Sequence, residues 1–132
     1  MPTQSATKPQ ARSAITNGTA LVAGVDGRST WCRRLRDLVA LHLSDLGGED
    51  RVSEAEKSLV RRASVLEVEL ERIEATFAIE EPDAASLDAY QRAASSLRRL
   101  LESIGLQRRP RDITPDPLSY ARQRAVELED AE

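Results

Sequence analysis

The side chains that could perform chemistry are few in this sequence. Its 132 residues include a single cysteine, Cys32, and a single histidine, His42. One cysteine excludes an internal disulfide and any cysteine-based zinc site, and no histidine lies near Cys32 in sequence to complete a nucleophilic pair. We therefore expect both residues to be packed structural side chains and the protein not to be an enzyme.

An acidic flank is the next candidate for chemistry. Glu67, Glu71 and Glu74 share one side of a predicted helix, and carboxylates placed in this way can bind a metal inside a helical bundle. Such a site needs further ligands on facing helices, where Glu102 is the single candidate. We therefore expect a solvated acidic flank. The turn at 47–50 lacks the ligand spacing of a calcium loop, and no phosphate-loop motif occurs, so no metal or cofactor is predicted.

Arginine dominates the basic residues and is suited to forked contacts with phosphate or carboxylate groups. The net charge of −3 argues against a generally basic nucleic-acid binder, yet residues 1–36 hold six basic residues and one acidic residue. Two arginine sets could meet at one end of the molecule and contact DNA phosphates without reading bases. The alternative is ordinary solubility and ion pairing with Asp37, Asp45 and Asp112. The candidate DNA-binding residues are Arg28, Arg33, Arg34, Arg36, Arg108, Arg109 and Arg111.

Apolar spacing predicts the first helix that positions these side chains, over residues 29–46. Ser29 can serve as its N-cap, and the glycines at 47 and 48 allow the turn that ends it. Its apolar stripe comprises Trp31, Leu35, Leu38, His42 and Leu46.

Two longer helices, over 53–79 and 84–104, are expected to form an antiparallel hairpin. Ser53 and Glu56 fit a capping box at the start of the first, while Pro82 and Asp83 end it and cap the second. Both helices carry apolar residues at alternating steps of three and four, which is the spacing of a heptad seam. The seams comprise Leu59, Ala63, Leu66, Leu70, Ile73 and Phe77, and Leu87, Tyr90, Ala94, Leu97, Leu101 and Ile104.

A second apolar stripe on the helix over 53–79 lies away from the seam. A helix that is apolar on two faces needs two partners. We expect the helix over 29–46 to cover part of this stripe and a neighbouring subunit to cover the rest, because a chain this small and poor in aromatic residues is a candidate for oligomerisation. The predicted oligomer interface comprises Val65, Val68, Ala75 and Ile79.

The two ends of the chain differ from this core. Residues 1–28 are predicted to form a disordered arm, 29–106 the helical core, and 107–132 a basic turn followed by a short helix that Asp116 and Pro117 begin. The fold class is therefore all-α. No signal peptide or membrane-spanning stretch is apparent, so a cytoplasmic location is expected. The partner-docking stripe of the last helix comprises Leu118, Ala121, Ala125 and Leu128.

The residues that begin and end the helices between Arg33 and Asp112 resemble those of P27-like small subunits of phage terminases, including prophage and gene-transfer-agent copies. One helix ends in Leu43-Ser44-Asp45-Leu46-Gly47, and the next opens with Val52-Ser53-Glu54-Ala55-Glu56. A later helix ends Leu97-Arg98-Arg99-Leu100-Leu101-Glu102-Ser103-Ile104-Gly105-Leu106, before the basic Pro110-Arg111.

The resemblance implies a non-enzymatic subunit in the cytoplasm of a bacterial host. Small terminase subunits assemble into rings, bind double-stranded viral DNA and present it to the large subunit, which carries the ATPase and nuclease. Many of them have a separate N-terminal helix-turn-helix domain for DNA. Residues 1–28 are predicted to be too loosely ordered to form one, so DNA contact would fall to the arginines. The alternative function is a small helical adaptor or regulator that binds one protein partner without touching DNA.

Overall fold

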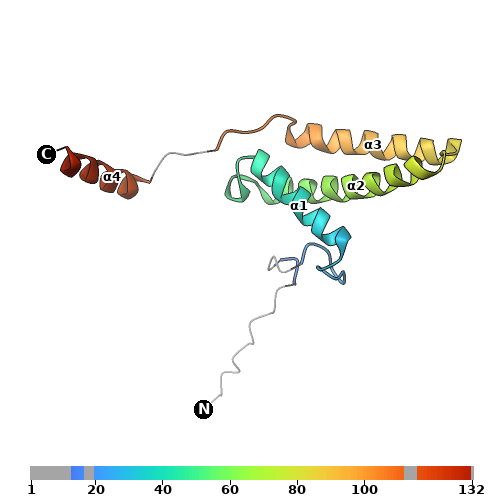
Figure 1. The fold of residues 1–132 in the computed structure, drawn as a ribbon, viewed down its shortest axis with the longest axis horizontal. Helices are drawn as coiled ribbons and strands as arrows, with labels where there is room; N and C mark the ends of the chain where they lie inside the picture. The colour runs from blue at the N-terminus through green and yellow to red at the C-terminus, as the bar shows by residue number, and fades with distance from the viewer. Residues whose placement is uncertain (1–12, 17–19, 112–115, 132) are drawn as a thin grey trace, which may run out of the picture.

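Four α-helices and one short 3₁₀ helix form the regular structure of this computed structural model, which describes residues 13–16, 20–111 and 116–131 (Figure 1). No strand occurs in these ranges, so the predicted all-α class is confirmed. In chain order the elements are α1 (Thr30–Asp45), η1 (Glu49–Arg51), α2 (Glu54–Ile79), α3 (Ala84–Ile104) and α4 (Pro117–Asp130).

Local capping sets the helix boundaries as the sequence predicts. The Ser29 hydroxyl accepts from the backbone N–H of Cys32 at the start of α1. Ser53 and Glu56 form a reciprocal capping box on α2. The Asp83 carboxylate accepts from a backbone N–H in the first turn of α3. Each cap satisfies donors that the first helical turn leaves unpaired.

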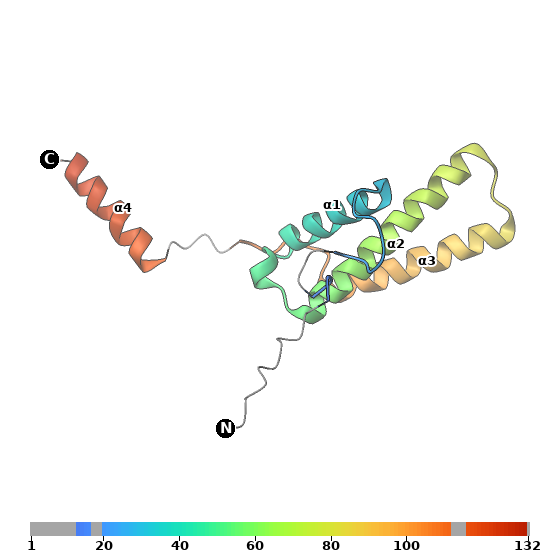
Figure 2. The same ribbon diagram turned by 90° about the horizontal axis from the view of Figure 1, so that it is seen from below.

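Helix α2 lies between the other two core helices. Figures 1 and 2 show α3 running antiparallel beside α2 along its whole length, with α1 crossing the half of α2 nearer its N-terminus on the other side. The ring of Phe77 meets that of Tyr90 edge-on, with centroids 5.4 Å apart, so the predicted seam joins α2 to α3. The helical hairpin is therefore present, with α1 laid across one half of it.

The buried core is confined to the half of the hairpin that α1 covers. One cluster joins the end of α1 to the start of α2 and the end of α3, and the other joins the middle of α1 to α2. Beyond α1, α2 is covered by α3 alone, and Ile79 is 90% exposed. The two clusters comprise Leu46, Val52, Val60 and Ile104, and Leu35, Leu38 and Val68.

The segment before α1 corrects one prediction. Leu21 and Val22 are partly buried and pack against the cluster of Leu35, Leu38 and Val68. The prediction of a disordered arm is wrong for these two residues, because the apolar face of α1 and α2 extends far enough to hold them. Residues 1–12 and 17–19 of the predicted arm lie outside the described residues.

The last helix, α4, has no buried side chain along its length. Asp116 caps it by accepting from the backbone N–H groups of Leu118 and Ser119, and Pro117 occupies its first turn, as predicted. Within the described residues, no helix combines the length and apolar character needed to cross a bilayer.

Candidate nucleic-acid interface

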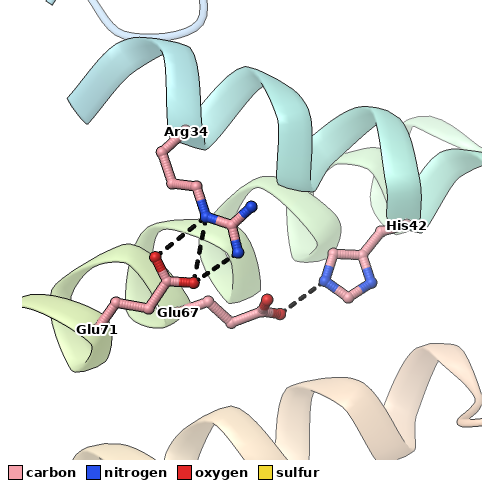
Figure 3. Close-up of polar contacts among 4 residues, drawn as sticks. All are labelled: Arg34, His42, Glu67 and Glu71. Carbon is pink, nitrogen blue, oxygen red and sulfur yellow. Dashed lines mark hydrogen bonds and ion pairs between the residues drawn. The ribbon is translucent and has the colours of Figure 1, made fainter. Parts of the chain in front are cut away.

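A pair of ion pairs joins α1 to α2 (Figure 3). The Arg34 guanidinium forms a forked contact with the Glu71 carboxylate, its shortest N–O distance being 2.7 Å. Two turns further along α1, His42 Nε2 lies 2.6 Å from Glu67 Oε1. Both pairs bind α1 to one flank of α2. Arg34 therefore has a carboxylate partner within the chain, and its role in DNA binding stays a prediction.

These pairs shift the protonation of their members. The hydrogen bond from Arg34 lowers the pKa of Glu71, and the contact with Glu67 raises the pKa of His42 above its ordinary value of 6.5. The third contact of the series has an uncharged donor: Trp31 Nε1 donates to Glu69 Oε1 at 2.8 Å. The shifts favour the protonated form of His42 and the ionised form of Glu71, and these charged forms hold α1 against α2.

The acidic flank on α2 is partly exposed, as expected, and its carboxylates also have partners. Glu67 and Glu71 contact α1, and Glu74 accepts from the hydroxyl of Tyr90 on α3. Among the described residues, no three potential ligands gather in a way that could hold a metal ion. Cys32 is buried, as predicted.

A second junction forms where α1 and α3 end and α2 begins, and Arg109 lies at its centre. The backbone N–H of Arg109 donates to the carbonyl of Asp45, 2.6 Å away, at the end of α1. Its guanidinium donates to the carbonyl of Ile104 at 3.0 Å and pairs with Glu56 Oε2 at 2.8 Å. One residue thus ties three helices together, and its role in DNA binding stays a prediction.

Two other arginines of this turn remain largely in solvent. A hollow of about 460 Å³ beside Ser44 is lined by Arg108, Arg109, Pro110 and Arg111. The Arg108 side chain is 74% exposed and contacts Asp45 at 3.4 Å, and Arg111 donates to the Ser44 hydroxyl at 3.4 Å. These long contacts leave both guanidinium groups able to meet an incoming phosphate.

The remaining predicted arginines lie at the other end of α1. Arg28, Arg33 and Arg36 are exposed near its N-terminus, and Arg36 also donates to the carbonyl of Gly27 at 3.4 Å. Helix α1 has 16 residues and is therefore about 24 Å long. The structure does not bring the two arginine sets together, because α1 separates them.

The predicted oligomer interface divides into a covered and an open part. Val68 is 3% exposed and packs against α1 with Val65, so both belong to the core of one chain. Their prediction as interface residues is wrong, because α1 occupies the surface that a neighbour would need. Ala75 and Ile79 are exposed beyond the start of α1.

The predicted docking stripe on α4 is fully accessible. Leu118 and Leu128 are 70% and 65% exposed, and the alanines between them are exposed as well. Tyr120 and Val126, which lie outside this stripe, are also 54% and 56% exposed.

Sequence reasoning named Glu67 and Glu71 as an acidic flank but did not predict that these side chains bind α1. Glu67, Glu69 and Glu71 recur every second position on α2, and each meets a side chain of α1. The available signal was the opposite charge of the two segments, since residues 54–82 hold eight acidic and four basic residues. We used that asymmetry to predict DNA binding, whereas part of it is satisfied within the chain.

The fold and this geometry define the class as a small all-α protein built on a helical hairpin. Comparison with protein-family models, with curated proteins and with solved structures gives no match. The resemblance to small terminase subunits therefore stays a prediction from the sequence.

Proposed function

We propose that this protein is a non-enzymatic DNA-packaging subunit of the small-terminase type, acting in the cytoplasm of a bacterial host. In this role it oligomerises, binds double-stranded phage DNA and presents that DNA to a large terminase subunit. The proposal needs a surface for phosphates and a separate surface for the large subunit.

The observation that carries the proposal is the position of the exposed arginines. Arg108 and Arg111 flank a hollow at the end of the bundle and stand in the chain directly before the segment that leads to α4. Contacts of this kind position a duplex and carry no sequence information. A DNA-binding turn next to an accessible helix suits a protein that delivers DNA to a partner.

Helix α4 is the proposed contact with the large subunit. Its apolar stripe from Leu118 to Leu128 covers about 15 Å of helix and faces solvent. An amphipathic helix of this kind can place its apolar face in a groove of a partner.

Salt-dependent retention of duplex DNA tests the proposal. The protein should bind at low salt with an affinity that falls steeply as salt rises. Replacing Arg108 and Arg111 together by Gln should weaken binding and reduce the slope of the salt dependence by about 1–2 counterions. Arg99→Gln, on the exposed face of α3, is the matched control and should change neither. Absence of binding at low salt would reject the DNA role.

The second candidate is the adaptor without DNA contact. The ion pairs of Arg34 with Glu71 and of Arg109 with Glu56 favour it, because they neutralise arginines that DNA binding would use. This candidate predicts no DNA retention at any salt concentration, together with binding of a protein partner that depends on Leu118 and Leu128.

A further inference from the structure

The turn over residues 107–111, which carries the exposed Arg108 and Arg111, is docked on the end of α1. The backbone N–H of Arg109 donates to the carbonyl of Asp45 at 2.6 Å. Gly47 is buried with φ 102°, and a β-carbon at this position would lie 3.6 Å from the carbonyl oxygen of Pro110. The backbone of the turn therefore packs directly against the residues that follow α1.

Glu56, in the first turn of α2, holds this docked turn from the other side. Its two carboxylate oxygens have separate tasks. Oε1 accepts from the backbone N–H of Ser53 at 3.5 Å, and Oε2 is screened from water and lies 2.8 Å from the Arg109 guanidinium. A carboxylate oxygen removed from water costs free energy unless a cation stays beside it. Glu56 therefore keeps the Arg109 side chain against the bundle.

The same contacts fix the backbone between the two exposed arginines. Arg108 and Arg111 line the hollow beside Ser44, where each makes one contact of 3.4 Å, with Asp45 and with Ser44 respectively. Two guanidinium groups bind neighbouring phosphates more tightly when the backbone that carries them is already ordered, because less conformational freedom is lost on binding. Arg109 stands between them in the chain and supplies that order.

We propose that Glu56 is a positioning residue for DNA binding, an inference that rests on the proposed function. Through its ion pair with Arg109 it holds the turn over residues 107–111 so that Arg108 and Arg111 meet the phosphate backbone together. A carboxylate near a phosphate is repelled by it, so charge alone gives Glu56 the opposite effect. The inference therefore predicts that loss of this negative charge weakens DNA binding.

Retention of duplex DNA at low salt by Glu56→Gln tests this sign. The glutamine oxygen can still accept from Ser53, but its amide N–H₂ then opposes the Arg109 guanidinium. The dissociation constant should rise roughly fivefold, although the protein becomes less acidic. The control is Glu54→Gln, which makes the same charge change in the same turn of α2, where the native side chain is 92% exposed. It should leave binding unchanged or slightly tighter.

Glu56→Asp is a second variant that keeps the charge. It shortens the side chain by one methylene, so the carboxylate no longer reaches Arg109, while an acidic residue in the first turn still suits the helix. It should weaken binding about as much as Glu56→Gln. Circular dichroism should show native helix content for both variants.

The variant with Arg108 and Arg111 both replaced by Gln separates positioning from a general loss of stability. In that background Glu56→Gln should change the dissociation constant by less than about twofold, because Glu56 acts through the two arginines. A purely structural role would give the same loss in both backgrounds.

The outcomes distinguish this inference from the proposed function. Absence of DNA binding by the native chain at low salt rejects both. DNA binding by the native chain, together with a Glu56→Gln variant that binds as tightly as Glu54→Gln or loses equal affinity in both backgrounds, overturns the positioning role alone.

Discussion

At the scale of single residues, arginines of one short turn perform different tasks. Arg109 contacts the ends of three helices, whereas Arg108, its neighbour in sequence, has a side chain 74% exposed. The carbonyl of Ile104 and the partly covered carboxylate of Glu56 both contact the Arg109 guanidinium, so this side chain is fixed in position. Both residues are arginines, so the position of each side chain in the fold, and not the residue type, decides how accessible its guanidinium is.

Arg109→Ala should lower the melting temperature by roughly 5 °C, because Glu56 and the carbonyl of Ile104 both lose a partner. Arg108→Ala removes a single long contact with Asp45 and should change the melting temperature by less than about 2 °C. Thermal unfolding followed by circular dichroism measures both. Equal effects of the two substitutions would show that Arg109 does not join the helices.

The pairing of His42 with Glu67 predicts a dependence of stability on pH. Because the folded-state pKa of His42 is raised above 6.5, the protonated pair contributes fully below the unfolded value and its contribution is lost as pH rises through the folded value. The free energy of unfolding from this pair should therefore fall on going from about pH 6 to pH 9. Urea unfolding across this range measures the change.

His42→Gln provides the comparison for this effect. The chain has no other histidine, so the variant removes the one imidazole that titrates in this range. The difference in stability between native and variant proteins should narrow with rising pH. A constant difference would mean that the two side chains do not interact as an ion pair.

At the scale of elements, α2 is the helix on which the core depends. It contacts α3 along one face and α1 along another, as a helix with two apolar stripes must. The short η1 helix and the glycine at position 48, with φ 107°, turn the chain between α1 and α2. That turn lets α1 fold back onto the near half of α2 and leaves the far half covered by α3 alone.

Leu35→Ala tests whether α1 belongs to the core. Leu35 is completely buried between α1 and α2, so its truncation should cost about 2–5 kcal/mol of the free energy of unfolding. Leu41→Ala, where the native side chain is 59% exposed, should cost less than about 1 kcal/mol. Denaturant unfolding measures both. A small effect at Leu35 would mean that α1 is held mainly by its polar contacts.

At the scale of the whole molecule, the bundle has two unlike ends (Figure 2). At one end three helices close on a buried cluster and on Arg109, and the chain leaves toward α4. At the other end the hairpin extends beyond α1 with an acidic tip and the exposed Ile79. The proposed DNA contacts of Arg108 and Arg111 therefore lie at the end where the helices close on Arg109.

The sequence by itself determined the helices and their boundaries. Capping residues such as Ser53 and Asp83 act on backbone groups within one turn, and heptad spacing reports which residues share a face. These are local properties, so the predicted bounds of α2 and α3 agree with the structure.

Only the tertiary structure decided which surfaces remain free. It showed that α1 covers Val68, that Leu21 packs on the core, and that Arg34 and Arg109 are held by carboxylates distant in sequence. Such pairings depend on where the chain folds back, and no local pattern encodes the distance between two helices. The fold therefore divides each predicted set of site residues, because burial and ion pairing are properties of the packed molecule.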